Sequence, residues 1–417
     1  MPVNLNLAPG LPVSGIELAT VSAGLKADGS ADMVLIKLAE TSSCAAVFTQ
    51  NAFCAAPVTI CRQHLLSNKG AVRALLINSG NANAGTGQPG IEMALGHCDA
   101  VASALNVTVD SVLPFSTGVI GQLLPDGVMR SGIVDSASSI EQPDGAASDT
   151  SVSDEQAWTN AARGIMTTDT QPKLTSKTVE INGTTVTITG MAKGAGMIQP
   201  NMATMLSYVF TDAKIDVPHL DVALRDAVDV SFNAITVDSD TSTNDACVLV
   251  ASGVGPSIDP EHAQWSDFVS ALRSVCVDLA QAIIRDAEGA TKFITVTVNS
   301  GKSNTECKNV AYSIANSPLV KTAMFASDAN VGRLLMAIGK ADVPSLDASI
   351  ITVSLGDVVA FEAAGIANGY TEERGAAVMA EDEIEVVIDL ARGEASASVY
   401  TSDLSHDYVS INADYRS

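Results

Sequence analysis

The chain has 417 residues, 47% of them hydrophobic and 17% charged, which is enough for one large layered domain or for two to three smaller ones. Its 47 acidic residues against 23 basic ones give a net charge of −24, and Lys and Arg form no block. Such a surface repels a phosphate backbone, so we expect no nucleic-acid partner.

Neither a targeting segment nor a metal site is predicted. The first residues lack the basic and apolar regions of a signal peptide, and no run reaches the ~18 apolar residues of a membrane span. The 7 cysteines are scattered without a C-x-x-C pair, as is typical of small core residues in a reducing compartment. The 5 histidines form no zinc-binding pattern. We therefore expect a cytoplasmic protein with no membrane contact and no bound metal.

Apolar, β-prone runs alternate along the chain with segments of helical periodicity. The predicted strands are Ala74–Asn78, Val179–Thr189, Met205–Phe210, Cys247–Ala251, Phe293–Val298, Ile350–Leu355 and Ile384–Asp389. The predicted helices are Ile91–Leu105, His219–Val230 and Trp265–Asp286. Asn182-Gly183 inside the second strand run is a strong hairpin signal. These elements predict a layered α/β architecture with mixed or antiparallel sheets.

Two further segments bear on the organisation of the chain. Residues 85–90 match G-x-G-x-x-G, but the match begins several residues after the preceding predicted strand, so we favour a chance match over a dinucleotide site. Residues 135–154 are rich in Ser, Asp and Gly and contain Pro143, which predicts a loop or linker.

Three polar stretches interrupt apolar surroundings. Ile77–Gly87 is rich in Asn and Gly, and it either aims N–H groups at an anion or forms Asn-stabilised turns. Ser116-Thr117-Gly118 reads as a turn, with the alternative that a hydroxyl beside a glycine N–H forms an oxyanion hole. Met166–Lys173 contains three threonines and Asp169, and by itself it favours capping and turn chemistry over a site.

Thr204 stands between a glycine-rich loop, which begins at Lys193, and a predicted buried strand. In an intact chain its hydroxyl has no built-in base, and a buried strand-edge threonine is the simpler interpretation. If the bond between Ala203 and Thr204 were cut, the new α-amine, with a pKa near ~7.7–8, would be a general base beside the hydroxyl. The residues alone leave both interpretations open.

Seven segments in order along the chain resemble the ornithine acetyltransferase (glutamate N-acetyltransferase) family of arginine biosynthesis. They are Val47–Val58, Leu75–Gly87, Ser116–Gly121, Met166–Lys173, Lys193–Leu206, Asp286–Phe293 and Ser405–Ser417. The chain departs from the family at Val331, where tryptophan is common. The resemblance implies a four-layer α/β sandwich similar to that of N-terminal nucleophile hydrolases.

The resemblance also implies self-cleavage between Ala203 and Thr204, which would give an α chain of residues 1–203 and a β chain of residues 204–417. The mature form would be an α₂β₂ heterotetramer. Thr204 would be the nucleophile that carries the acetyl group from N-acetylornithine to glutamate, and Thr117 and Gly118 would form the oxyanion hole.

The resemblance implies one set of substrate contacts and no cofactor, and it leaves open whether acetyl-CoA is a further acetyl donor. The substrate contacts would be Thr167, Lys193, Thr204, Glu288, Asn412 and Ser417. Two alternatives remain open from the sequence. An N-terminal-nucleophile aminopeptidase or amidohydrolase would pass the acyl group to water, and a non-catalytic binding protein would remain one chain.

Overall fold

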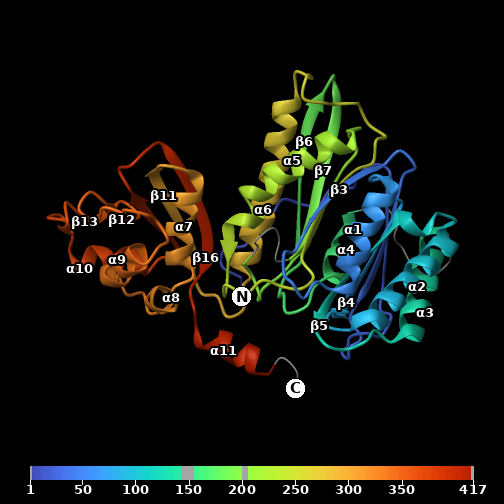
Figure 1. The fold of residues 1–417 in the computed structure, drawn as a ribbon, viewed down its shortest axis with the longest axis horizontal. Helices are drawn as coiled ribbons and strands as arrows, with labels where there is room; N and C mark the ends of the chain where they lie inside the picture. The colour runs from blue at the N-terminus through green and yellow to red at the C-terminus, as the bar shows by residue number, and fades with distance from the viewer. Residues whose placement is uncertain (1, 142–154, 200–204, 415–417) are drawn as a thin grey trace.

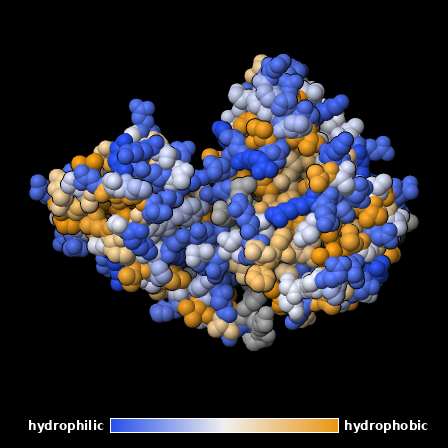
Figure 2. Space-filling model, viewed as in Figure 1, coloured by the Kyte–Doolittle hydropathy of each residue, from blue (hydrophilic) through white to orange (hydrophobic). Residues whose placement is uncertain are grey.

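The computed structural model describes residues 2–141, 155–199 and 205–414. These residues form two lobes, a larger one built by the first two thirds of the chain and a smaller one built by the last third (Figure 1). On the face shown in Figure 2 hydrophilic side chains predominate, and the surface is hollowed between the lobes at its upper edge. Within the described ranges no helix is long and apolar enough to cross a membrane.

The first sheet of the larger lobe has four strands in the order β1-β2-β4-β5. The strands are β1 (Ile16–Val21), β2 (Met33–Leu38), β4 (Ala74–Asn81) and β5 (Val112–Val119). Its helices are α1 (Ala56–Asn68), α2 (Gly87–Leu105) and α3 (Asp126–Glu141), with the short η1 (Val109–Ser111) before β5. β2 is apolar on both faces, since α2 and α3 pack on one face of the sheet and a second sheet packs on the other. β4 and β5 run parallel, joined by α2 as a crossover helix.

The second sheet has five strands in the order β3-β10-β8-β7-β6. The strands are β3 (Ser43–Phe48), β6 (Lys173–Ile181), β7 (Thr184–Lys193), β8 (Leu206–Thr211) and β10 (Ala246–Ala251). Helices α5 (Val217–Asp229) and α6 (Trp265–Arg285) cover its outer face, and η2 (Phe232–Ala234) follows α5. β8 pairs with β7 on one side and with β10 on the other, so the two strands that follow residues 200–204 in the chain lie between strands that precede them.

Aromatic and aliphatic side chains fill the space between the two sheets. Tyr208 of β8 meets Phe115 of β5 edge-to-face at 5.2 Å between ring centroids. Helix α4 (Glu155–Gly164) inserts Trp158, whose ring meets Phe210 at 5.3 Å. Helices, sheet, sheet and helices therefore stack in that order, which confirms the expected four-layer α/β sandwich (Figure 1).

A third sheet, of seven strands, forms the smaller lobe in the order β14-β13-β12-β15-β11-β16-β9. Its strands are β9 (Ile235–Thr236), β11 (Phe293–Gly301), β12 (Thr352–Leu355), β13 (Val358–Glu362), β14 (Gly365–Ile366), β15 (Glu383–Asp389) and β16 (Ala395–Ser402). The helices are α7 (Asn304–Ala315), α8 (Pro318–Phe325), α9 (Val331–Gly339) and α10 (Glu372–Met379). Helix α11 (His406–Ala413) follows β16, and its Tyr408 packs against the core of the larger lobe. Val331, where the family commonly has tryptophan, begins α9 and is buried in this lobe's core. The short β9 leaves the larger lobe to pair with β16, which ties the two lobes together.

Local signals predicted several of these elements correctly. The hairpin at Asn182-Gly183 is confirmed, with φ values of 53° and 76° that suit a type I′ turn between β6 and β7. All three predicted helices are present as α2, α5 and α6. The predicted loop over residues 135–154 is wrong in its first part, because α3 continues to Glu141 on buried residues such as Ile140. Residues 142–154 lie outside the described ranges.

Candidate active site

A pocket of about 260 Å³ opens where the end of β5, the end of β7 and the start of β8 meet. The loop before β10 and the turn after α6 complete its walls, and helix α11 reaches its edge. The site is thus built at the boundary between the two sheets of the sandwich, from segments far apart in the sequence.

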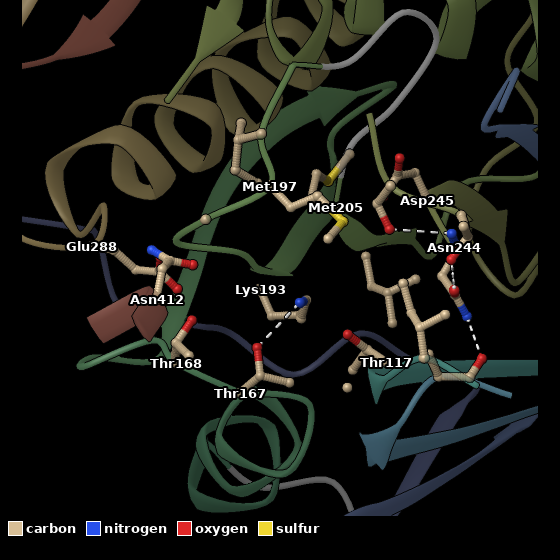
Figure 3. A pocket seen from close by; sticks show the side chains of 18 residues that line it. Thr117, Thr167, Thr168, Lys193, Met197, Met205, Asn244, Asp245, Glu288 and Asn412 are labelled. Atoms are coloured by element: carbon tan, nitrogen blue, oxygen red, sulfur yellow. Dashed lines mark hydrogen bonds between the residues drawn. The ribbon is translucent and has the colours of Figure 1, made fainter. Parts of the chain in front are cut away.

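Every predicted site residue within the described ranges lines this pocket. They are Thr117, Gly118, Thr167, Lys193, Glu288 and Asn412. Ala203, Thr204 and Ser417 lie outside the described ranges, although Met205, the residue after Thr204 in the chain, also lines the pocket. In Figure 3 the Thr117, Thr167 and Lys193 side chains lie close to one another, and Glu288 and Asn412 approach from the side opposite Asn244.

Lys193, the last residue of β7, brings a positive charge into the pocket. Its Nζ donates a hydrogen bond of 3.3 Å to Thr167 Oγ1. Burial lowers the pKa of Lys193, and the carboxylates of Asp169 and Asp245 oppose this shift in part. A carboxylate ligand strongly stabilises a cation that has so little hydration.

Glu288 brings a negative charge to the other end of the pocket, in the turn that follows α6. Asn412 of α11 donates a 2.7 Å hydrogen bond to Glu288 Oε2, and the Glu288 N–H bonds to the carbonyl of Ala195 at 2.9 Å. A Cβ at Gly196 would lie 2.4 Å from that carboxylate, so only glycine leaves room for it. With Lys193, Glu288 suits a small ligand that carries both a carboxylate and an ammonium group.

Thr117 and Gly118 belong to β5, so the interpretation of Ser116-Thr117-Gly118 as a turn is wrong. β5 pairs in parallel with β4 through this segment, so residues that the sequence pattern assigned to a loop are part of a strand. Gly118 has φ of +131°, and a Cβ there would lie 2.3 Å from the carbonyl carbon of Gly80. The strand therefore requires glycine at this point.

A buried ionic cluster, formed by Lys173, Asp169 and Asp286, lies beneath the pocket. Lys173 Nζ lies 2.6 Å from Asp169 Oδ1 and 2.7 Å from Asp286 Oδ2, and all three side chains are almost completely buried. Burial alone would raise the pKa of Asp169, but the Lys173 and Lys193 cations hold it below its ordinary value. Burial likewise would lower the pKa of Lys173, and the two carboxylates raise it instead.

This ionic cluster ties together the segments that carry the pocket residues. Asp169 accepts hydrogen bonds from the N–H groups of Thr167 at 3.0 Å and Gly194 at 2.7 Å. Asp286 accepts from the Thr170 N–H at 2.9 Å and from the Thr170 hydroxyl. The loop before β6, the loop after β7 and the turn after α6 therefore share one buried anchor.

The segment that leads from β7 to residue 199 is held by a second carboxylate, Asp238. Its oxygens accept hydrogen bonds from the N–H groups of Met197 at 2.7 Å and Ile198 at 2.8 Å. Tyr408 of α11 donates its hydroxyl to the same carboxylate at 3.0 Å. Met197 has φ of 55°, which an L residue rarely adopts and which these contacts hold in place.

Sequence reasoning missed several residues of this site. Thr168, Asn244 and Asp245 line the pocket, and Lys173 anchors it from below. The run of polar residues 238–245 directly before a buried strand was an available signal for Asn244 and Asp245. For Lys173 the sequence shows only the start of a strand, because its partner Asp286 is 113 residues away.

A family model and the curated relatives agree on one family. The model of the ArgJ family matches residues 17–417. An "Arginine biosynthesis bifunctional protein ArgJ" from Pseudomonas syringae pv. tomato is 49% identical, over 100% of both chains. A solved structure of the protein of that name from Bacillus halodurans is 40% identical over 50% of this chain and 98% of its own, with a TM-score of 0.48. A solved ornithine acetyltransferase from Mycobacterium tuberculosis, complexed with ornithine, is 32% identical over 48% of this chain and 96% of its own, with a TM-score of 0.37.

Proposed function

The chain belongs to the ArgJ family, and from this premise we propose that its pocket transfers an acetyl group from N-acetylornithine to glutamate in arginine biosynthesis. The observation that carries the proposal is the convergence of Thr117, Gly118, Lys193 and Glu288 on one pocket beside Met205. Zwitterionic amino acids fit the opposite charges at its two ends, and an acyl transfer needs the hydroxyl and N–H donors at its floor.

In the first half-reaction the Thr204 Oγ attacks the acetyl carbonyl of N-acetylornithine. The Thr204 α-amine takes the hydroxyl proton and passes it to the departing ornithine nitrogen as the C–N bond breaks. The Thr117 hydroxyl and the Gly118 N–H stabilise the oxyanion of the intermediate. Lys193 pairs with the substrate α-carboxylate, and Glu288 pairs with the side-chain ammonium.

In the second half-reaction the α-amine of glutamate attacks the acetyl-threonine ester. The ester C–O bond breaks as the Thr204 α-amine takes a proton from the glutamate nitrogen and passes it to Thr204 Oγ. N-acetylglutamate then leaves. One amide is exchanged for another, so no energy source is consumed. We also propose that acetyl-CoA acetylates the same threonine as a second donor, and the word "bifunctional" in the relative's name supports this.

The free α-amine requires cleavage before Thr204, which would divide the chain into residues 1–203 and 204–417. Sheet pairing would keep the two parts together, because β8 and β10 from the second part are hydrogen-bonded to β7 and β3 from the first. We propose an α₂β₂ assembly of two such pairs, located in the cytoplasm. The 7 cysteines are all free, in keeping with a reducing compartment.

An acetyl-transfer assay tests the proposed function. Purified protein is incubated with N-acetylornithine labelled in the acetyl group, with and without glutamate. We expect N-acetylglutamate and ornithine in equal amounts, with the parallel double-reciprocal lines of a ping-pong reaction. Release of labelled acetate at the same rate without glutamate would instead support an amidohydrolase. A parallel reaction with acetyl-CoA and glutamate tests the second donor.

Glu288→Gln should separate the two substrates. The carboxylate pairs with the ornithine ammonium, so its loss should raise the KM for N-acetylornithine by about 10-fold or more. Glutamate has no side-chain ammonium, and its KM should not rise. Lys193→Met is the matched comparison, because it removes the partner of the α-carboxylate that both substrates share. Equal increases of both KM values in Glu288→Gln would contradict the role assigned to Glu288.

Gly118→Ala is expected to lower kcat by about 10²-fold, the usual effect of losing one oxyanion donor. The added Cβ would lie 2.3 Å from Gly80 and must displace the end of β5. Gly121→Ala is the control, since Gly121 also has a positive φ, of +88°, but a Cβ there meets nothing within 4 Å. The control should retain kcat and lose about 1 kcal/mol of stability. A similar fall of kcat in both variants would show that backbone strain, not displacement of the oxyanion segment, is responsible.

A further inference from the structure

Asn244 lines the pocket, yet both of its amide N–H donors are used by the protein itself. Nδ2 donates to the carbonyl of Ala82 at 2.6 Å and to the carbonyl of Ser116 at 2.8 Å, while Oδ1 accepts from the Thr243 hydroxyl at 2.6 Å. The opposite orientation of the amide would set its oxygen against two carbonyl oxygens. The residue is only 6% exposed, so this side chain is built into the wall of the site.

The two bonds from Asn244 cross from one sheet to the other. Ser116 lies in β5 of the first sheet and Ala82 directly follows β4 of that sheet, whereas Asn244 lies two residues before β10 of the second sheet. Elsewhere the two sheets contact each other largely through apolar side chains. Such contacts hold the layers together but are not directional, whereas hydrogen bonds define a spacing and a register.

Asn244 is also connected through hydrogen bonds to the segment before Thr117 and to the segment after Thr204. Ser116 directly precedes Thr117, and its own hydroxyl is held by Asn78 Oδ1 at 2.6 Å. On the other side, the N–H of Ala246 bonds to the carbonyl of Met205 at 2.9 Å, and β10 continues in parallel with β8. The position of Asn244 therefore links the residue before Thr117 to the residue after Thr204.

We propose that Asn244 is a positioning residue that sets the distance between the oxyanion segment Thr117–Gly118 and the nucleophile. This inference rests on the proposed function, in which Thr204 attacks and Thr117 and Gly118 hold the oxyanion. Without the amide, two buried carbonyls lose their donors and the two sheet edges are free to shift. A displacement of about 1 Å between nucleophile and oxyanion hole costs roughly 10²-fold in rate.

Kinetics of Asn244→Ala and Asn244→Leu test the proposal. The leucine variant keeps the side-chain volume but lacks both donors. Both variants should lose about 10²-fold in kcat with KM changed by less than about 3-fold, and leucine should not restore the rate. A large rise of KM at unchanged kcat, or recovery by leucine, would overturn the proposal. Rates are expressed per cleaved chain, with cleavage quantified by mass spectrometry.

A double-mutant cycle with Thr117→Ala shows whether Asn244 acts through the oxyanion hole. If it does, Asn244→Ala should lower kcat clearly less in the Thr117→Ala background than in wild type, because only the Gly118 donor is then left to be positioned. Losses that multiply would show that the two residues act independently, which contradicts the positioning role. Asn68→Ala is the matched control, because Asn68 also donates its amide to a backbone carbonyl, that of Asp110 at 2.6 Å, but does not line the pocket.

Hydrogen exchange gives a readout that does not depend on activity. Peptides that cover residues 81–86 and 112–121 should exchange faster in Asn244→Ala than in wild type, while peptides from α6 should not change. Unchanged exchange in the first two peptides would overturn the link between the sheets even if the wild type is an active acetyltransferase. Faster exchange in a protein without acetyltransferase activity would instead support the link and count against the proposed function.

Discussion

A Thr204→Ala variant is expected to remain one chain of 417 residues and to lose at least about 10⁴-fold in acetyl transfer. The hydroxyl is both the group that would attack the preceding peptide bond and the group that would carry the acetyl. Without it no new α-amine is released, so nucleophile and general base disappear together. Because one residue supplies both, this is the largest effect that any single substitution should have on activity.

Denaturing mass spectrometry of wild type beside Thr204→Ala checks this expectation. Wild type should give two fragments that divide between Ala203 and Thr204. Thr204→Ser is the control, since serine keeps a hydroxyl and an α-amine and should still be cleaved. Cleavage of the alanine variant at the same bond, or a wild type that is active while intact, would contradict the mechanism.

Lys173→Met is expected to reduce the free energy of unfolding at neutral pH by about 3–5 kcal/mol, the typical cost of removing one partner of a buried ion pair. Methionine fills much of the same volume, so little of the loss should come from a cavity. It arises because the Asp169 and Asp286 carboxylates are left in a buried site without the cation that lies between them.

Lys177→Met is the matched control, on the same strand β6. Its ion pair with Asp278 is exposed, with side-chain exposures of 38% and 33%, and such pairs contribute about 0–1 kcal/mol. Denaturant unfolding of both variants beside wild type measures the difference. Equal losses in the two variants would show that the buried cluster is not the anchor that we infer.

The stability difference between Lys173→Met and wild type should also depend on pH. In wild type the lowered pKa of Asp169 stabilises the fold above its unfolded value of about 3.9, and this contribution is lost as the pH falls. The raised pKa of Lys173 stabilises the fold below the unfolded value of about 10.4, and this contribution is lost as the pH rises. In the variant, burial should raise the pKa of Asp169. Protonation of Asp169 at low pH then removes the cost of keeping a buried carboxylate without the Lys173 cation. The difference should therefore shrink from pH 8 toward about pH 4–5, and a difference that grows on acidification would contradict this account.

The sequence by itself determined the elements whose signals are local. Asn182-Gly183 predicted the hairpin, because two adjacent residues that tolerate positive φ are enough for its turn. Helices α2, α5 and α6 followed from a periodicity of apolar residues that one helix face imposes. The seven family segments also led to six residues that line the pocket, Thr117, Gly118, Thr167, Lys193, Glu288 and Asn412, although no single stretch among them carried that information.

Only the tertiary structure decided how these residues meet. The segment Ser116–Gly118 reads as a turn from its composition, and pairing with β4 makes it a strand. Lys173 and Asn244 also reach partners that are 113 and 128 residues away, and no local pattern reveals those distant contacts. Propensity and periodicity depend on neighbours within a few residues, whereas the site depends on two sheets packing face to face. That packing places the ionic cluster around Lys173 beneath the pocket, and it places the Asn244 amide between the oxyanion segment Thr117–Gly118 and Met205.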